Sequence, residues 1–193
     1  MNVVERAKKI IMSPKEEWEV IAAETTNVQE LYLSYALILA AIPAVASFIG
    51  KSLIGISLGP LGVYRVPVGS ALIGAVVQLA LTLAGVFVLA YIIDALAPSF
   101  GGEKDILASH KLAVYSSTAA WVAGVFNIIP ALAVIGALLS LYSLYLFYVG
   151  ATPVKKVPKD KVLGFTIVVI IVAIIIWAII GAILGATFYA RRM

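Results

Sequence analysis

One acidic side chain lies within a long stretch of this sequence that is otherwise uncharged. Asp94 follows the apolar run Val66–Ile93. A carboxylate inside a bilayer is costly and is often functional. Asp94 is therefore a candidate for an ion, proton or lipid-headgroup site, and the alternative is a structural or capping role at the helix end. The polar residues that could share a site with it inside the membrane are Gln78, Asn127, Tyr115 and Ser116.

Other kinds of chemistry find little support in the residue types present. The chain has no cysteine and one histidine, His110, so thiolate and His-rich metal sites cannot form. The sequence contains no HExxH, GxSxG, P-loop or dinucleotide-binding pattern. We therefore expect no catalytic residues, no metal and no cofactor. His110 precedes Lys111 in a charged connector, where we expect it to be solvated or interfacial.

Apolar runs dominate the chain, which is 63% hydrophobic and 12% charged. Runs of about 20 apolar residues are long enough to cross a bilayer as helices. The sequence predicts an all-α integral membrane protein with five transmembrane helices, preceded by short amphipathic interfacial helices within residues 1–27. The transmembrane domain covers residues 28–193, with spans at about 31–50, 70–97, 110–129, 131–150 and 162–190.

The N-terminal segment is amphipathic. At the helical spacing of about 100° per residue, residues 2–12 place one apolar stripe opposite a charged face. This stripe lies either in the headgroup region or against the end of the bundle. A second helix is predicted to begin at Ser13-Pro14, with Ser13 as its cap, and Asn27 is predicted to cap the next. The expected membrane-interface residues are Val3, Val4, Ala7, Ile10, Ile11 and Trp18.

The distribution of basic residues predicts the orientation. With five spans and a cytoplasmic N-terminus, ten Lys and Arg residues lie inside and four outside, which follows the positive-inside rule. We expect a multi-pass protein of the cell membrane with its C-terminus outside. The net charge of +4 is interpreted as this topology signal, so no nucleic-acid partner is expected. Residues 52–69, rich in Gly and Pro, predict an irregular or hairpin-like interfacial loop.

Small residues recur at helical spacing in several spans. Gly181 and Gly185 form a GxxxG pair that lets two helices approach closely. Packing within the chain and homo-oligomer formation are both compatible with this motif. The lipid bilayer is the one partner that the composition requires.

Several short motifs follow one another along the chain. They are residues 13–21 (Ser-Pro-Lys-Glu-Glu-Trp-Glu-Val-Ile), Gly101-Gly102, Ala113-Val114-Tyr115-Ser116, Asn127-Ile128-Ile129-Pro130 and the Tyr-rich stretch 141–150. In this order they resemble the Yip1 domain family. The resemblance implies five spans and a cytoplasmic N-terminus. Family members often carry a proline shortly after Tyr-Ser, where this chain has Ala119, which predicts a straighter third helix.

Eukaryotic relatives in this family are linked to membrane traffic and Rab-type GTPases. This chain lacks their long cytosolic N-terminal region, so a small-GTPase partner is not expected, and the short tail resembles prokaryotic members. We favour a non-catalytic membrane scaffold of the trafficking or membrane-organising type. The alternative is a transporter, channel or lipid-moving protein that uses Asp94, Gln78 and Asn127. An intramembrane enzyme is the third hypothesis, and it lacks a paired acid and base.

Overall fold

The structure, a computed structural model, describes residues 2–175, and this part of the chain is helical apart from one short hairpin. The α-helices are α1 (Val3–Met12), α2 (Pro14–Ala23), α3 (Val28–Leu31), α4 (Leu37–Ile49), α5 (Val68–Leu96), α6 (Ile106–Ser116), α7 (Thr118–Ala123), α8 (Ala133–Ser140) and α9 (Tyr142–Lys155). Shorter 3₁₀ and π turns extend them: η1 (Tyr32–Ala36), η2 (Gly50–Ile54), η3 (Gly59–Leu61), η4 (Ala97–Phe100), η5 (Gly124–Ile128) and η6 (Pro130–Leu132).

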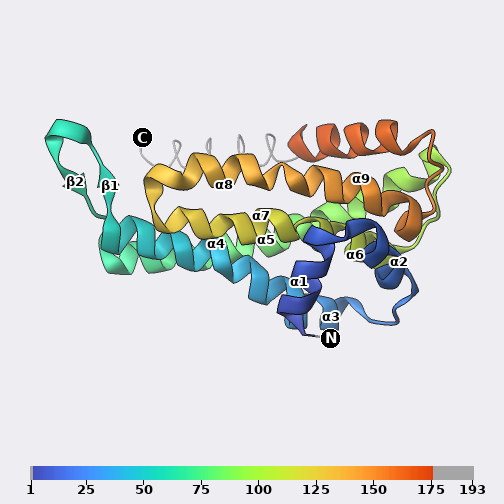
Figure 1. Ribbon diagram of the computed structural model, residues 1–193, viewed down its shortest axis with the longest axis horizontal. Helices are drawn as coiled ribbons and strands as arrows, with labels where there is room; N and C mark the ends of the chain where they lie inside the picture. Colours follow the sequence, from blue (N-terminus) through green and yellow to red (C-terminus); the bar gives the residue numbers. More distant parts are fainter. Residues whose placement is uncertain (1, 176–193) are drawn as a thin grey trace, which may run out of the picture.

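Within the described residues, three helical segments are long and apolar enough to cross a membrane: Val28–Ile54, Val68–Phe100 and Pro130–Lys155. A shorter apolar helix covers Val162–Ile175. These segments run side by side along the long axis of the molecule (Figure 1). In Val68–Phe100, only 6% of the most apolar window is buried by protein. A helix that is apolar all round and exposed in this way needs a lipid environment.

The third predicted span is not one regular helix. Helix α6 ends at Ser116, α7 begins at Thr118, and the tighter turn η5 follows. The hydroxyls of Ser116 and Ser117 both donate to the carbonyl of Ala113, at 3.2 and 2.8 Å. Such local bonds compete with the helical ladder and often bend helices. The third segment is therefore irregular although it has Ala119 in place of a proline.

The break between the third and fourth segments lies where the sequence predicts it. Ile129 is extended (φ −110°, ψ 105°), and Pro130 begins η6. Glycines let helices approach closely beside this turn. A Cβ on Gly50 would lie 2.2 Å from the carbonyl oxygen of Asn127, and one on Gly124 would lie 2.4 Å from Pro43. Small residues at these positions therefore let α4 and η2 pack directly against η5.

The loop predicted as hairpin-like is a hairpin. Strand β1 (Ile56–Ser57) pairs antiparallel with β2 (Val63–Tyr64), with Ile56 opposite Tyr64. Gly55 and Gly62 flank the strands with φ angles of 92° and 94°, which residues other than Gly rarely adopt. The hairpin projects beyond the helices at one end of the molecule, which we call the hairpin end (Figure 1).

The opposite end carries the connectors 101–105 and 156–161, and we call it the connector end (Figure 1). Helices α1 and α2 pack on the bundle towards this end, α2 against α9 and α1 against α2 and α7. Pro14 begins α2 as predicted, but the Ser13 side chain makes no capping bond. Asn27 does cap α3, accepting from the amide of Glu30 at 2.8 Å. The large buried side chains here include Trp18, Ile21, Leu112, Leu146 and Phe165.

Candidate functional site

Asp94 lies in the last turns of α5, where its carboxylate is held by two side chains. The ammonium of Lys155 and the hydroxyl of Ser109 both donate to Asp94 Oδ1, each at 3.1 Å. Asp94 is 8% exposed, and Lys155 is completely buried. A buried charge of this kind must be paired, because desolvation of an isolated ion is too costly. The carboxylate is thus part of an ion pair that joins α5, α6 and α9.

The chain around this pair folds so that the ends of three helices meet. Asp105 caps α6 by accepting from the amide of Ala108 at 3.0 Å. Its own carbonyl accepts from Lys155 Nζ at 2.9 Å. The amide of Glu103 donates to the carbonyl of Lys155 at 2.9 Å. The connector 101–105 therefore wraps the C-terminal end of α9 and supplies the second partner of the Lys155 ammonium.

A close approach of backbone to backbone makes this wrapping feasible. A Cβ on Gly102 would lie 2.8 Å from the carbonyl oxygen of Lys155. The neighbouring Gly101 has a φ of 78°, in the left-handed region that favours glycine. The Gly101-Gly102 motif therefore has a physical role in placing Lys155 beside Asp94.

A second buried ionic cluster fastens the N-terminal helices. Arg6 of α1 donates to Glu17 at 2.6 Å and to Glu24. Arg6 and Glu17 are 3% and 5% exposed. The Arg6 guanidinium carbon also lies 5.5 Å from the centre of the Tyr115 ring, within the range of a cation–π contact. Arg6 therefore joins α1, α2 and α6.

Lys111 completes this cluster from α6. Its ammonium donates to the carbonyl of Ile21 at 2.8 Å and to the carbonyl of Glu24. These are carbonyls at the C-terminal end of α2, which have no partner within the helix. A cation at a helix C-terminus is also favoured by the helix dipole. Lys111 thus acts as a C-terminal cap for a helix far away in the sequence.

His110 is buried, contrary to the expectation of a solvated or interfacial side chain. It is 1% exposed and lies among the rings of Tyr32, Phe87 and Tyr91, at centroid distances of 4.9 to 5.9 Å. Its Nδ1 is 3.2 Å from the Tyr32 hydroxyl. The expectation failed because α6 packs against α5, whose Phe87 and Tyr91 cover the face of α6 that carries His110.

The structure does not assemble the predicted polar residues into one site. Gln78 precedes Asp94 by sixteen positions on α5, about 24 Å along the helix. Asn127 lies in η5, near the hairpin end, where its carbonyl meets Gly50. The Tyr115 ring instead makes an edge-to-face contact with Trp18 and a tilted contact with Tyr35. The Ser116 hydroxyl donates to the carbonyl of Ala113 in its own helix.

A separate cavity lies beside Gln78. It is lined by Lys51, Ser47 and Ser70, among others, and has a volume of about 280 Å³. Asp94 does not line it. Gln78 and Asp94 therefore belong to different surroundings at different depths.

The residues expected at the membrane interface contact protein to different extents. Ile10 and Trp18 are fully buried and Ala7 is 7% exposed, whereas Val4 is 73% exposed. Val3 and Ile11 are half-buried, and the Ile11 carbonyl accepts from the Tyr142 hydroxyl at 3.0 Å. Of the two interpretations of the apolar stripe, packing on the bundle is the one seen. Trp18 packs on Gly150 and is not an interface anchor, because its ring is enclosed by protein.

The outer face of α1 carries an ordinary surface ion pair. Lys9 lies 2.9 Å from Glu5, one turn away. The hydrogen bond from Lys9 lowers the pKa of Glu5, and the same bond raises the pKa of Lys9. The pair is exposed, so it contributes little to stability. The Gly181 and Gly185 pair lies outside the described residues.

Two comparisons with known proteins bear on this arrangement. The model of the Yip1 domain matches residues 8–180, which include Asp94, Ser109 and Lys155 of the first ionic cluster. Of the second cluster they include Glu17, Glu24 and Lys111, whereas Arg6 precedes the matched residues. The chain belongs to the Yip1 domain family. The inner membrane protein YohC of Escherichia coli strain K12 is 27% identical over 156 residues, 79% of this chain and 80% of that protein. The same protein from Escherichia coli O6:H1 gives the same values. No solved structure matches the chain significantly.

Membership of the Yip1 family and the long apolar helices together make the chain an integral membrane protein. Neither match indicates a catalytic family. Among the described residues, no group of three or more His, Asp or Glu side chains could hold a metal ion.

Lys155, Ser109, Arg6 and Glu17 are the site residues that sequence reasoning missed. The chain gives one signal for Lys155: it follows Pro153 closely and ends a span that has no other charge. Helical spacing placed Arg6 on the charged face of residues 2–12, opposite the apolar stripe. Nothing in the sequence shows that α2 covers this side of α1.

Proposed function

We propose that this Yip1 family member is a non-catalytic scaffold of the cell membrane, with the bilayer and a second copy of the chain as its partners. Its residues 1–27 form a cap on a five-span domain of residues 28–193. The N-terminus and the connector end face the cytoplasm, and the C-terminus lies outside. The name of the Escherichia coli relative, an inner membrane protein, supports this location.

The observation that carries the proposal is that the buried charged side chains at the connector end hold helices together. The buried charges there bond to one another or to helix-end carbonyls, and these bonds join α1, α2, α5, α6 and α9. Charged side chains that carry a solute across a membrane must exchange partners during transport. The buried charged side chains here instead form two clusters, each of which joins three or more elements. A rigid cap on a lipid-exposed bundle is suited to organising a membrane and has no acid and base pair placed for catalysis.

Reconstitution of the purified full chain tests the proposal. We expect vesicles to change their diameter with the protein-to-lipid ratio, measured by electron cryomicroscopy. Flux of ions, flux of small solutes and scrambling of labelled lipids should stay at the level of protein-free vesicles, in the wild type and in Asp94→Asn. Transport or scrambling by the wild type that Asp94→Asn abolishes would overturn the scaffold.

The cavity beside Gln78 favours a second candidate, a transporter or lipid-moving protein. Lys51, Ser47 and Gln78 give this cavity a polar lining within a segment that is otherwise apolar. If this is a transport site, Gln78→Leu should abolish flux and Asp94→Asn should leave it unchanged, because the two residues are far apart. This pattern differs from that expected for a mechanism centred on Asp94.

A further inference from the structure

A cleft at the connector end combines basic and apolar walls. It has a volume of about 440 Å³ and lies between α2, the end of α9 and the start of the helix Val162–Ile175. Its polar groups come from Lys15, Glu19, Tyr148, Thr152 and Lys159, and its apolar wall includes Val149. We call it the lysine cleft.

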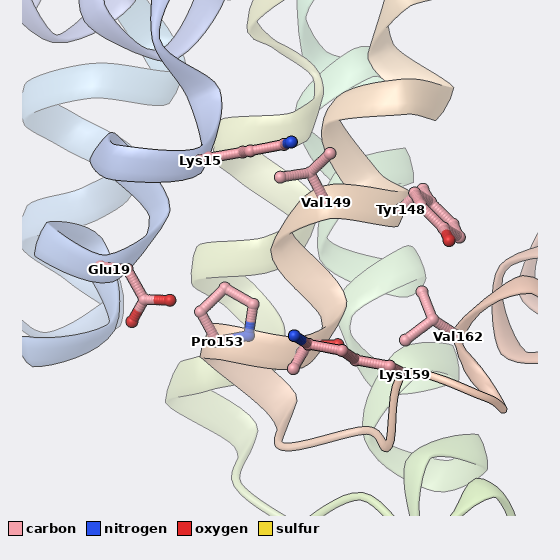
Figure 2. Close-up of a pocket in the computed structure, with 8 residues that line it drawn as sticks. Lys15, Glu19, Tyr148, Val149, Pro153, Lys159 and Val162 are labelled. Atoms are coloured by element: carbon pink, nitrogen blue, oxygen red, sulfur yellow. The ribbon is translucent and has the colours of Figure 1, made fainter.

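The two lysines of the lysine cleft come from distant parts of the chain. Lys15 extends from α2 towards Val149, and Lys159 extends from the connector 156–161 towards Pro153 (Figure 2). Both lysines are exposed. Glu19 projects from α2 towards Pro153, so two cations and one carboxylate face the same space (Figure 2). The charge of these three groups sums to +1, which is complementary to a ligand that carries one negative charge.

A second, apolar groove lies along the helical segment α8–α9 on the hairpin side of the lysine cleft. It has a volume of about 670 Å³ and is lined by α7, η5, α8, α9 and Ile11 of α1. The α8–α9 positions that line the two hollows are Leu138, Leu141, Tyr142, Tyr145, Tyr148, Val149 and Thr152. Their spacing of three or four residues places them on one face. Tyr148 and Leu138 are about 15 Å apart along the helix, the scale of most of an acyl chain.

We propose that the lysine cleft binds the phosphate of an anionic glycerophospholipid, with one acyl chain lying in the apolar groove. Lys15 and Lys159 donate to the phosphate oxygens, as lysines at a membrane surface do with anionic headgroups. Glu19 accepts from a headgroup hydroxyl, so a phosphatidylglycerol-type head fits better than a bare phosphate. Tyr148, at the level where aromatic side chains meet the headgroups, separates the two parts of the site. Binding here requires only that the connector end faces a leaflet, and it does not depend on the scaffold function.

Native mass spectrometry of the purified full chain in detergent tests this site, with dioleoyl-phosphatidylglycerol as the probe. We expect one molecule bound in preference to dioleoyl-phosphatidylcholine. Lys15→Gln with Lys159→Gln should weaken this binding about tenfold or more. The matched control is Lys8→Gln with Lys104→Gln, which removes the same charge from two other exposed positions. All four side chains are exposed, so both double variants should fold.

Three results would overturn the proposal. Equal loss of affinity in both double variants would mean that only the net charge attracts lipid. Equal binding of phosphatidylcholine and phosphatidylglycerol would mean that the cleft does not select an anionic head. Displacement of the lipid by millimolar glycerol 3-phosphate would identify a soluble phosphate as the ligand, because that molecule has no chain to occupy the groove.

Discussion

The Lys155 side chain is completely buried, so its ammonium depends on Asp94 for its compensating charge. Replacing Asp94 by Leu leaves that charge unpaired, and breaking a buried pair from one side costs about 3–5 kcal/mol. We therefore expect Asp94→Leu to lower the free energy of unfolding by this amount, measured by SDS titration in mixed micelles. Adding Lys155→Met should restore most of the loss, because no buried charge then remains.

The exposed pair on α1 provides the control for this comparison. Glu5→Gln removes a bond of similar length between exposed side chains, and it should change the free energy of unfolding by less than about 1 kcal/mol. If Asp94→Leu has an effect as small as that of Glu5→Gln, water must reach Lys155, and the pair is not the joint between α5 and α9 described above.

Gly150 allows α9 to approach α2 closely. A Cβ there would lie 2.5 Å from Trp18 Cε2 and 2.8 Å from Leu112 Cδ1. Since Trp18 is fully buried, its ring has no space into which to move. We expect Gly150→Ala to destabilise the protein by about 1–3 kcal/mol through overpacking, seen as a lower thermal unfolding midpoint in detergent.

Gly74→Ala is the matched control for Gly150→Ala. Gly74 also lies within a long helix, α5, and its Cβ would meet nothing within 4 Å. Because Ala favours the helix more than Gly, this change should leave the midpoint unchanged or raise it slightly. A lower thermal unfolding midpoint in both variants would mean that the effect comes from changed helix flexibility and not from a clash with Trp18.

At the scale of elements, α1 is attached mainly through Arg6 and Ile10. Arg6→Met leaves Glu17, which is 5% exposed, without its cation. We expect α1 to detach more often as a result, so that the amides of residues 3–12 exchange hydrogen at least tenfold faster in detergent or nanodiscs. The control is Lys9→Met on the exposed face of the same helix, which should leave the exchange rates within about twofold of the wild type. Unchanged exchange in Arg6→Met would show that the remaining contacts of α1, such as Ile10, Ala7 and the bond from Tyr142 to Ile11, hold it without Arg6.

The sequence predicted the helices and their caps better than it predicted which other segments pack over them. Helical spacing indicated the helix α1 and its apolar stripe, and the pair Asn27 and Glu30 indicated the cap at Asn27, because these features depend on residues close together in the chain. The burial of Arg6, Trp18 and His110 depends on other elements. Arg6 is covered by α2 and Tyr115, and Trp18 packs on α9 at Gly150. His110 is enclosed by the aromatic rings of Tyr32 and Phe87. Asp94 was found because a charge in an apolar run is a local anomaly, whereas its partner Lys155 stands among other lysines and looks like part of a solvated loop.

At the scale of the whole molecule, the described segments run alternately between the hairpin end and the connector end (Figure 1). Residues 28–54 run to the hairpin end and residues 68–100 run to the connector end. Residues 106–128 then run to the hairpin end, and residues 130–155 run to the connector end. Residues 106–128 are too irregular to count as one long helix, although at about 1.5 Å per residue they extend over roughly 34 Å. Five crossings therefore require that this bent segment spans the bilayer like its straighter neighbours.

Labelling of introduced cysteines tests that requirement directly, because the chain has no cysteine of its own. In intact cells, an impermeant maleimide should label Leu61→Cys in the hairpin and leave Lys104→Cys and Asp160→Cys unlabelled until the cells are lysed. Met193→Cys should be labelled from outside, because five crossings from a cytoplasmic N-terminus place the C-terminus outside. Labelling of Asp160→Cys but not Lys104→Cys would mean that one of the two segments between them does not cross. That result would contradict the structure, because Glu103 and Lys155, which are hydrogen-bonded to each other, would then lie on opposite sides of the membrane and the Asp94–Lys155 pair could not form. It would also place the four lysines of residues 155–161 outside, against the positive-inside rule.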